Sequence, residues 1–164
     1  AYFGKAADYG RMNMGLLNLA SYKSVWRGYE YFTDNYVINR TKESETKIRG
    51  IVRGSGQKHY NVFIDLEHPR KSQCNCPHAD GKRIICKHMI ALYFSTFPKE
   101  AEKYYNDVIK YREEEEQRQE ELEYNVIDYL HKLKKSELEQ LVLQILFDGP
   151  EWQYERFIAE NIDL

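Results

Sequence analysis

The feature that most constrains the fold of this chain is a cluster of four residues whose side chains bind transition metals. Cys74, Cys76, Cys86 and His88 form two pairs, C-x-C and C-x-H, with nine residues between them. Thiolate and imidazole are ligands that Zn²⁺ prefers, and three cysteines with one histidine are a standard tetrahedral set. The pattern therefore predicts one structural Zn²⁺, because four protein ligands leave no position for water.

The residues around the two pairs favour a metal site over a chance cluster of buried thiols. Pro77 and the Ala-Asp-Gly sequence at 79–81 predict a sharply turning chain after the first pair. The second pair lies at a predicted helix start, where backbone N–H groups favour a thiolate. His78 is the alternative to His88 as ligand, and His88 is preferred because it repeats the one-residue spacing. Iron and copper are alternatives to zinc, because they also bind such ligands. A catalytic Cys86–His88 pair is an alternative to a metal site, and it would require free thiols.

Hydrophobic periodicity predicts short helices and strands before the cluster and helices after it. Residues 9–20 are weakly helical, and Ser21 is expected to cap a helix that ends at Phe32. An antiparallel meander of three or four strands is expected next. Its strands are predicted at 36–41, 45–53, 60–66 and 72–74.

A helix over residues 86–97 is apolar on two sides, so it is expected to pack between the sheet and the helical tail. Everything from Lys99 onward has a helical pattern, and the stretch 112–121, which contains no apolar residue, predicts a solvated helix. Ser136 and Glu139 are expected to form a capping box for a later helix. A last short helix is expected over residues 152–162.

Charge is divided unevenly along the chain, although the net charge is only −2. Residues 1–98 contain 15 Lys and Arg against 8 Asp and Glu, whereas residues 99–164 contain 9 against 18. A basic part joined to an acidic part suggests that the first part meets a polyanion, and the alternative is that both surfaces are simply solvated.

The localisation expected from the sequence is cytoplasmic. Three cysteines clustered between residues 74 and 86 fit a metal site in a reducing compartment better than a disulfide scaffold. The first ten residues lack the basic-then-apolar pattern of a signal peptide, and no apolar stretch is long enough to span a membrane.

The four-residue pattern and its flanks resemble the SWIM zinc finger of bacterial proteins. The matching segments are Arg27-Gly28-Tyr29-Glu30-Tyr31, Val52-Arg53-Gly54-Ser55, Tyr60-Asn61-Val62, CNCP at 74–77, CKH at 86–88 and Leu133-Lys134-Lys135-Ser136-Glu137-Leu138. The resemblance covers roughly residues 21–147, and the acidic stretch at 112–123 departs from the commoner tail. It implies a ββα-type zinc module without catalytic activity, of a kind that accompanies Snf-type helicase-like ATPases and Mutator-type transposases.

The fold class predicted from these features is α+β. A small antiparallel sheet with a ββα-type zinc finger is flanked by a leading helix and a helical C-terminal tail. Three parts are expected: a leading helical segment at 1–35, the sheet with the finger at 36–98, and an acidic helical extension at 99–164.

Two functions follow, and neither involves catalysis. The first is a DNA-binding accessory module, which the resemblance places beside a Snf-type helicase-like ATPase. The cations expected to contact phosphates are Arg70, Lys71, Lys82, Arg83 and Lys87. The second is a protein–protein interaction module with a structural zinc and no nucleic-acid contact, which the acidic helical tail favours. An enzyme is not expected, because the sequence contains no carboxylate pair, serine nucleophile or phosphate-binding loop that suggests one. Neither a membrane nor a small-molecule substrate is expected.

Overall fold

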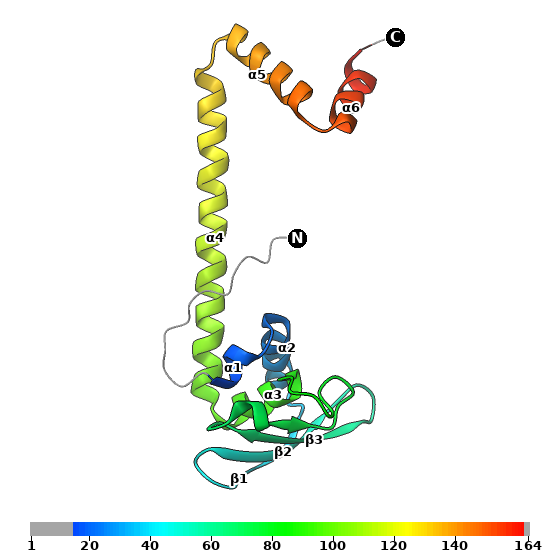
Figure 1. The fold of residues 1–164 in the computed structure, drawn as a ribbon. Coiled ribbons are helices and arrows are strands. Elements are labelled where there is room, and N and C mark those ends of the chain that lie inside the picture. Colours follow the sequence, from blue (N-terminus) through cyan, green and yellow to red (C-terminus); the bar gives the residue numbers. More distant parts are fainter. Residues whose placement is uncertain (1–14, 163–164) are drawn as a thin grey trace. The chain divides into compact units, whose positions relative to one another are not determined.

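The computed structural model describes residues 15–162, so the first part of the weakly helical stretch at 9–20 lies outside the described residues. The chain divides into two compact units, Ala1–Asp107 and Val108–Leu164. The first unit contains a small sheet and the helices that pack on it, and the second is helical (Figure 1). The α+β class is confirmed.

The sheet is a four-stranded antiparallel meander. Its strands are β1 (Val37–Lys42), β2 (Lys47–Arg53), β3 (His59–Asp65) and β4 (Gln73–Cys74), in the order β1-β2-β3-β4. The predicted strands at 36–41, 45–53, 60–66 and 72–74 are therefore confirmed to within two residues. The register between β2 and β3 pairs Arg49 with Phe63 and Ile51 with Asn61.

The two faces of the sheet differ in burial. Ile48, Val52, Val62 and Ile64 are all 3% exposed or less. Because side chains alternate along a strand, the odd-numbered residues of β2 and β3 lie on the other face. The helices α2 and α3 lie on the same side of the sheet, which is the side of the buried residues (Figure 1).

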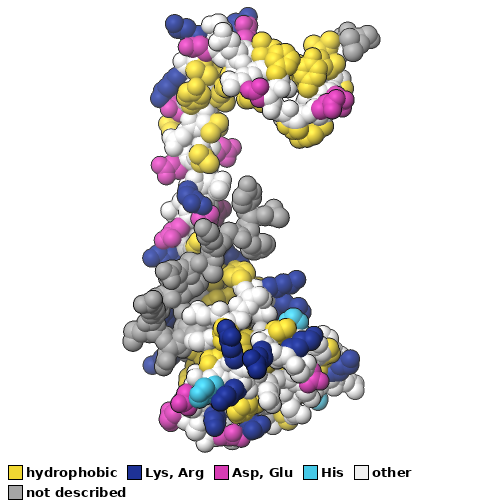
Figure 2. Space-filling model, in the orientation of Figure 1, with side chains coloured by type: hydrophobic (Ala, Val, Ile, Leu, Met, Phe, Trp, Pro, Cys, Tyr) yellow, Lys and Arg dark blue, Asp and Glu magenta, His cyan; other side chains and the backbone are white. Residues whose placement is uncertain are grey.

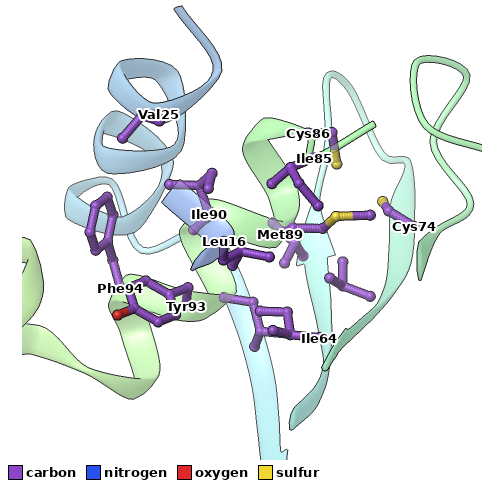
Figure 3. Close-up of a cluster of buried hydrophobic side chains, with 14 of the residues drawn as sticks. Leu16, Val25, Ile64, Cys74, Ile85, Cys86, Met89, Ile90, Tyr93 and Phe94 are labelled. Carbon is purple, nitrogen blue, oxygen red and sulfur yellow. The ribbon is translucent and has the colours of Figure 1, made fainter. Parts of the chain in front are cut away.

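The helix α3 (Lys87–Thr96) forms the centre of the first unit. Every residue from His88 to Ser95 is buried, which confirms that the helix packs on both sides. Its second layer is mainly α2 (Tyr22–Thr33), and the start of the helical tail also contacts it, since the rings of Phe94 and Tyr104 stack 5.5 Å apart. Apolar periodicity shows that a helix has two partners, but it does not identify them. Figure 3 shows Ile90 and Phe94 of α3 next to Val25 of α2 in one hydrophobic cluster.

The helix α2 begins where the sequence predicts. Ser21 is the N-cap, and its hydroxyl accepts a hydrogen bond from the backbone N–H of Ser24 at 3.2 Å. This satisfies one of the backbone donors that a helix N-terminus leaves without an intrahelical partner. The short helix α1 (Gly15–Leu19) precedes it and buries Leu16 and Leu17.

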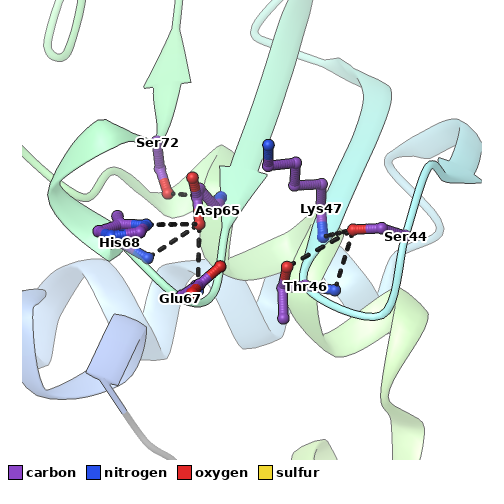
Figure 4. Close-up of polar contacts among 7 residues, drawn as sticks. All are labelled: Ser44, Thr46, Lys47, Asp65, Glu67, His68 and Ser72. Atoms are coloured by element: carbon purple, nitrogen blue, oxygen red, sulfur yellow. Dashed lines mark hydrogen bonds and ion pairs between the residues drawn. The ribbon is translucent and has the colours of Figure 1, made fainter.

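A buried carboxylate organises the connection from β3 to β4. One carboxylate oxygen of Asp65 accepts hydrogen bonds from the backbone N–H groups of Glu67 (3.1 Å) and His68 (2.8 Å) (Figure 4). The hydrogen bond from His68 is the main cause that holds the pKa of Asp65 below its usual value. The backbone N–H of Asp65 donates to the hydroxyl of Ser72. The short helix η1 (Pro69–Lys71) lies between them, so this network positions β4 and its Cys74.

The remaining helices are α4 (Pro98–Lys132), α5 (Lys135–Asp148) and α6 (Glu151–Asn161). The polar stretch 112–121 lies within α4, as predicted for a solvated helix, and α6 matches the last helix predicted. The predicted capping box of Ser136 and Glu139 is wrong by two residues. The helix α5 begins at Lys135, and the Glu137 carboxylate accepts a hydrogen bond from the backbone N–H of Lys134 instead. None of the described helices is both long and apolar enough to cross a lipid bilayer.

The packing of α2 on α3 depends on a glycine. A Cβ atom at Gly28 would lie 2.4 Å from the Cβ of Ile90 and 2.9 Å from the carbonyl oxygen of Lys87. Atoms at such distances overlap, so the two helices approach this closely only because Gly28 has no side chain. Gly28 belongs to the Arg-Gly-x-x-Tyr-like segment of the sequence.

Gly28→Ala is therefore expected to destabilise the first unit. An ordinary Gly→Ala change inside a helix stabilises by about 1 kcal/mol, whereas overpacking a core costs about 1–3 kcal/mol. We expect the second effect to dominate, with a lower midpoint of urea-induced unfolding. Lys23→Ala, at an exposed position of the same helix, is the control and should leave the midpoint nearly unchanged. A higher midpoint for Gly28→Ala would contradict the close helix contact.

Candidate metal centre

The four predicted ligands come together at one end of the first unit. Cys74 ends β4, Cys76 follows it by two residues, Cys86 is the N-cap of α3, and His88 is the second residue of α3. Their ligand atoms all lie within 4.8 Å of one another. The Nδ1 atom of His88 is 3.7 Å from the sulfur of Cys74 and 3.8 Å from that of Cys86.

These distances fit a tetrahedral zinc site. With Zn–S bonds of about 2.3 Å and a Zn–N bond of about 2.0 Å, neighbouring sulfur and nitrogen ligands of a regular tetrahedron lie about 3.5 Å apart. The separations of Nδ1 from the two sulfurs agree with that value to within a few tenths of an ångström. The four side chains are also no more than 4% exposed. The residues present therefore fit one structural Zn²⁺, which would stabilise the fold without taking part in chemistry.

The chain turns sharply just after the first pair of ligands. The backbone N–H groups of Ala79 and Asp80 donate to the carbonyl oxygen of Cys76, which closes a single helical turn after Pro77. Gly81 then has a φ of +66°, a left-handed conformation that glycine adopts readily. The predicted turn at residues 79–81 is thus confirmed.

Backbone donors surround the sulfurs and favour their ionised form. The N–H groups of His78 and Ala79 donate to the sulfur of Cys76, and the N–H of Met89 donates to that of Cys86. Such hydrogen bonds lower the pKa of a thiol, and the start of a helix adds the favourable end of its dipole. The position of Cys86 at the start of α3 therefore places its sulfur in the cluster and also favours its thiolate form.

The three sulfurs cannot all be ionised without a cation between them. The thiol of Cys74 donates a hydrogen bond to Cys86, which lowers the pKa of Cys86 to about 4 and raises that of Cys74. Burial raises the pKa of Cys76, and repulsion from the Cys86 thiolate raises it further. The thiolate of Cys86 is thus favoured, whereas those of Cys74 and Cys76 are disfavoured. A Zn²⁺ ion would supply the compensating charge for three thiolates.

The imidazole of His88 is held among aromatic rings. Its centroid lies 4.6 Å from that of Tyr60 and 5.5 Å from that of Tyr31. Nδ1 faces the sulfurs, and the buried Nε2 has no hydrogen-bond partner within residues 15–162. A neutral imidazole carries its proton on one nitrogen, so an Nδ1 ligand fixes the proton on Nε2. Ring packing, rather than a hydrogen bond, thus orients this ligand.

The structure also decides between the two histidines. His78 is exposed and is not part of the cluster of ligand atoms, so only His88 is placed to complete the four-ligand set.

The fold and the site define a small α+β module that binds zinc. Residues 60–96 match the family model of the SWIM zinc finger, a binding module rather than a catalytic domain. The match extends from β3 to the end of α3 and contains all four ligands, so this segment is a SWIM zinc finger, as its motifs suggested. Neither the comparison with curated proteins nor the comparison with solved structures finds a significant match.

A groove crosses the face of the sheet opposite α3 and gathers most of the predicted cations. Arg70, Lys71, Lys82 and Arg83 line it, and all four are exposed. The fifth, Lys87, lies elsewhere: its ammonium group is 4.1 Å from the centroid of Tyr31 and donates to the hydroxyl of that residue. Lys87 lines a smaller hollow together with Lys23 and Arg27.

Two further cations of the groove were missed by the sequence reasoning. Lys47 and Arg49 of β2 line the same groove. The available signal was the alternation of β2, in which these two residues flank the buried Ile48 and must face the other side of the sheet.

Metal binding is tested by native mass spectrometry of two histidine variants. We expect one zinc per wild-type chain, and a chelator should unfold the first unit, because zinc binding contributes folding free energy. His88→Ala removes a ligand, so its zinc affinity should fall by more than about 100-fold, beyond the ~10–100-fold effect of a residue outside the coordination sphere. His78→Ala is the control and should retain one zinc. Loss of zinc from the His78 variant alone would contradict the assignment.

Proposed function

We propose that this protein is a DNA-binding accessory module whose zinc finger supports a cationic sheet surface. The single observation that carries the proposal is the groove on the open face of the sheet. Six cations line it, namely Lys47, Arg49, Arg70, Lys71, Lys82 and Arg83, against two carboxylates, Asp65 and Asp80. One of these carboxylates, Asp65, is buried and engaged by backbone N–H groups.

The contacts proposed are with phosphate groups. Lysine and arginine supply most of the affinity of DNA-binding proteins by neutralising phosphates, and this contribution is independent of sequence. Figure 2 shows Lys and Arg side chains grouped on the surface of the first unit. The uneven charge of the sequence supports the same interpretation, because the excess of cations lies before residue 99.

The helix of the finger is not a candidate for reading base pairs. A recognition helix presents side chains to the major groove, whereas α3 is buried from His88 to Ser95. The zinc of this module would instead fix β4 and the turn that follows it. Lys82 and Arg83 come directly after that turn. Its role in DNA binding would be indirect.

The proposal includes no catalysis by this chain. If an ATPase works with the module, as the resemblance implies, it is a separate motor such as a Snf-type helicase-like ATPase. The proposal also places the protein in the cytoplasm, where thiol ligands stay reduced.

The proposal is tested by a salt titration of DNA binding. Fluorescence anisotropy with a labelled DNA strand and with its duplex should detect binding to at least one form at low salt. Up to six phosphate contacts predict a log–log slope against salt of about −4 for a single strand. Lys82→Glu with Arg83→Glu should weaken binding by more than about tenfold and flatten the slope.

The matched control has the same change in charge outside the groove. Lys99→Glu with Lys103→Glu changes two exposed cations of α4 that do not line the groove. This variant should bind nearly as the wild type does. Equal losses in both double variants would indicate a general charge effect, and no binding to either form of DNA at low salt would refute the proposed function.

A second candidate function, docking of a protein, is favoured by the second unit. The helices α5 and α6 expose large apolar side chains at Val142, Leu143, Phe147, Trp152 and Tyr154. Phe147 and Trp152 are 67% and 61% exposed, and apolar side chains are visible over both helices in Figure 2. Exposed apolar patches of this kind mark protein interaction sites. Acidic residues in the same helices suit a partner with a basic rim and disfavour DNA.

A further inference from the structure

We propose that the open face of the sheet binds single-stranded DNA by stacking a base on the guanidinium plane of Arg49, which itself lies on the ring of Phe63. This inference rests on the proposed DNA-binding function and adds the form of DNA and the contacting groups. It follows from three features of the groove: an aromatic ring at its centre, a fixed guanidinium plane on that ring, and a surface too wide to enter a DNA groove.

The centre of the groove is a pair of directly opposed residues on neighbouring strands. Arg49 of β2 is paired with Phe63 of β3 in the register of the sheet. The guanidinium carbon of Arg49 lies 4.5 Å from the centroid of the Phe63 ring, which is the distance of a cation–π contact. Both residues line the groove. A cation and an aromatic ring thus form one stacked unit on the solvent-facing side.

The guanidinium group is held in place but remains accessible. The Nε atom of Arg49 donates to the carboxylate of Glu43 at 2.5 Å, while the ring of Phe63 supports the group from the sheet. The side chain of Arg49 is nevertheless 59% exposed. A guanidinium plane fixed on two sides offers its outer face to an unstacked base, and proteins use both arginine planes and aromatic rings in this way.

The surroundings suit a flexible, charged strand. Asn39, Asn61, Gln73 and Asn75 line the groove beside the stacked pair, and their amide groups donate and accept hydrogen bonds. The cations at 70, 71, 82 and 83 line the same groove, where they can contact the phosphates of a strand whose bases lie on the sheet. Glu43 and Asp80 are the nearby exposed or half-exposed carboxylates, and the Arg49 side chain partly neutralises the first.

The dimensions of the surface disfavour a duplex. Strands are spaced about 4.8 Å apart, so β1 to β4 span about 14 Å before side chains are added. The major groove of B-DNA is about 12 Å wide and accepts a helix or a two-stranded ribbon. A four-stranded sheet therefore cannot enter it lying flat, and the buried α3 cannot enter it either. Bases become available to a flat platform only when the strand is unpaired.

The experiment compares one mixed-sequence DNA strand with the duplex that it forms with its complement. Fluorescence anisotropy on the full zinc-loaded chain at moderate salt should give at least a tenfold higher affinity for the single strand. Equal or tighter binding of the duplex would overturn this inference and leave the proposed DNA-binding function intact. No binding to either would refute both.

Two substitutions separate stacking from charge. Phe63→Leu keeps an apolar side chain without a π face, and Arg49→Lys keeps the charge without a planar group. Each should lower the affinity for the single strand by roughly tenfold, and Arg49→Lys should leave the salt slope unchanged because no charge is lost. Arg53→Lys is the matched control. Arg53 lies on the same strand, 4.5 Å from the ring centroid of Tyr36, and does not line the groove.

A spectroscopic readout tests the stacking itself. A strand containing 2-aminopurine should change its fluorescence when the base stacks on wild-type protein, and the change should be lost in Phe63→Leu and Arg49→Lys but not in Arg53→Lys. Each variant is first checked for one bound zinc and an unchanged unfolding midpoint. Wild-type affinity and an unchanged fluorescence response in both groove variants would overturn the inference.

Discussion

The structure of the first unit depends on the convergence of three sulfurs and one imidazole from two different segments of the chain. Cys74 and Cys76 belong to the last strand and the turn after it, whereas Cys86 and His88 belong to the start of α3. The strand β4 has only two residues, so its backbone hydrogen bonds alone hold it weakly. Coordination of one Zn²⁺ by all four side chains would join this short strand to the central helix, with a free energy of roughly 10–16 kcal/mol. That is comparable to the whole stability of a typical domain.

The two faces of the sheet that the zinc site joins to α3 have different surroundings. One face is filled by α3, which is itself covered by α2, and the contact of those helices is close because Gly28 has no side chain. On the other face, no helix of the described part of the first unit covers the sheet, and the groove with its cations lies there. Because α3 is buried on both sides, the groups proposed to contact DNA lie on the sheet rather than on this helix. The metal centre therefore supports the proposed binding surface without forming part of it.

The sequence predicted the local features because their causes are local. The metal ligands are recognisable by side-chain chemistry and spacing, the cap at Ser21 by its hydroxyl, and the strands by alternation. Features that depend on long-range packing were not predictable. The sequence showed that α3 has two apolar sides but not that α2 covers one of them. The stacked pair of Arg49 and Phe63 depends on the register of β2 and β3, which is set by the turn that joins them. The burial of Asp65 was not predicted from the sequence either, and its carboxylate accepts hydrogen bonds from backbone N–H groups of the next turn.

The measurement that tests the account most directly is zinc K-edge X-ray absorption of the purified chain. The account predicts three sulfur ligands at about 2.3 Å and one nitrogen ligand at about 2.0 Å, with no oxygen from water. Such a coordination shell would show that Cys74, Cys76, Cys86 and His88 close around one ion. A shell with fewer than three sulfurs, or with oxygen ligands, would contradict the central claim.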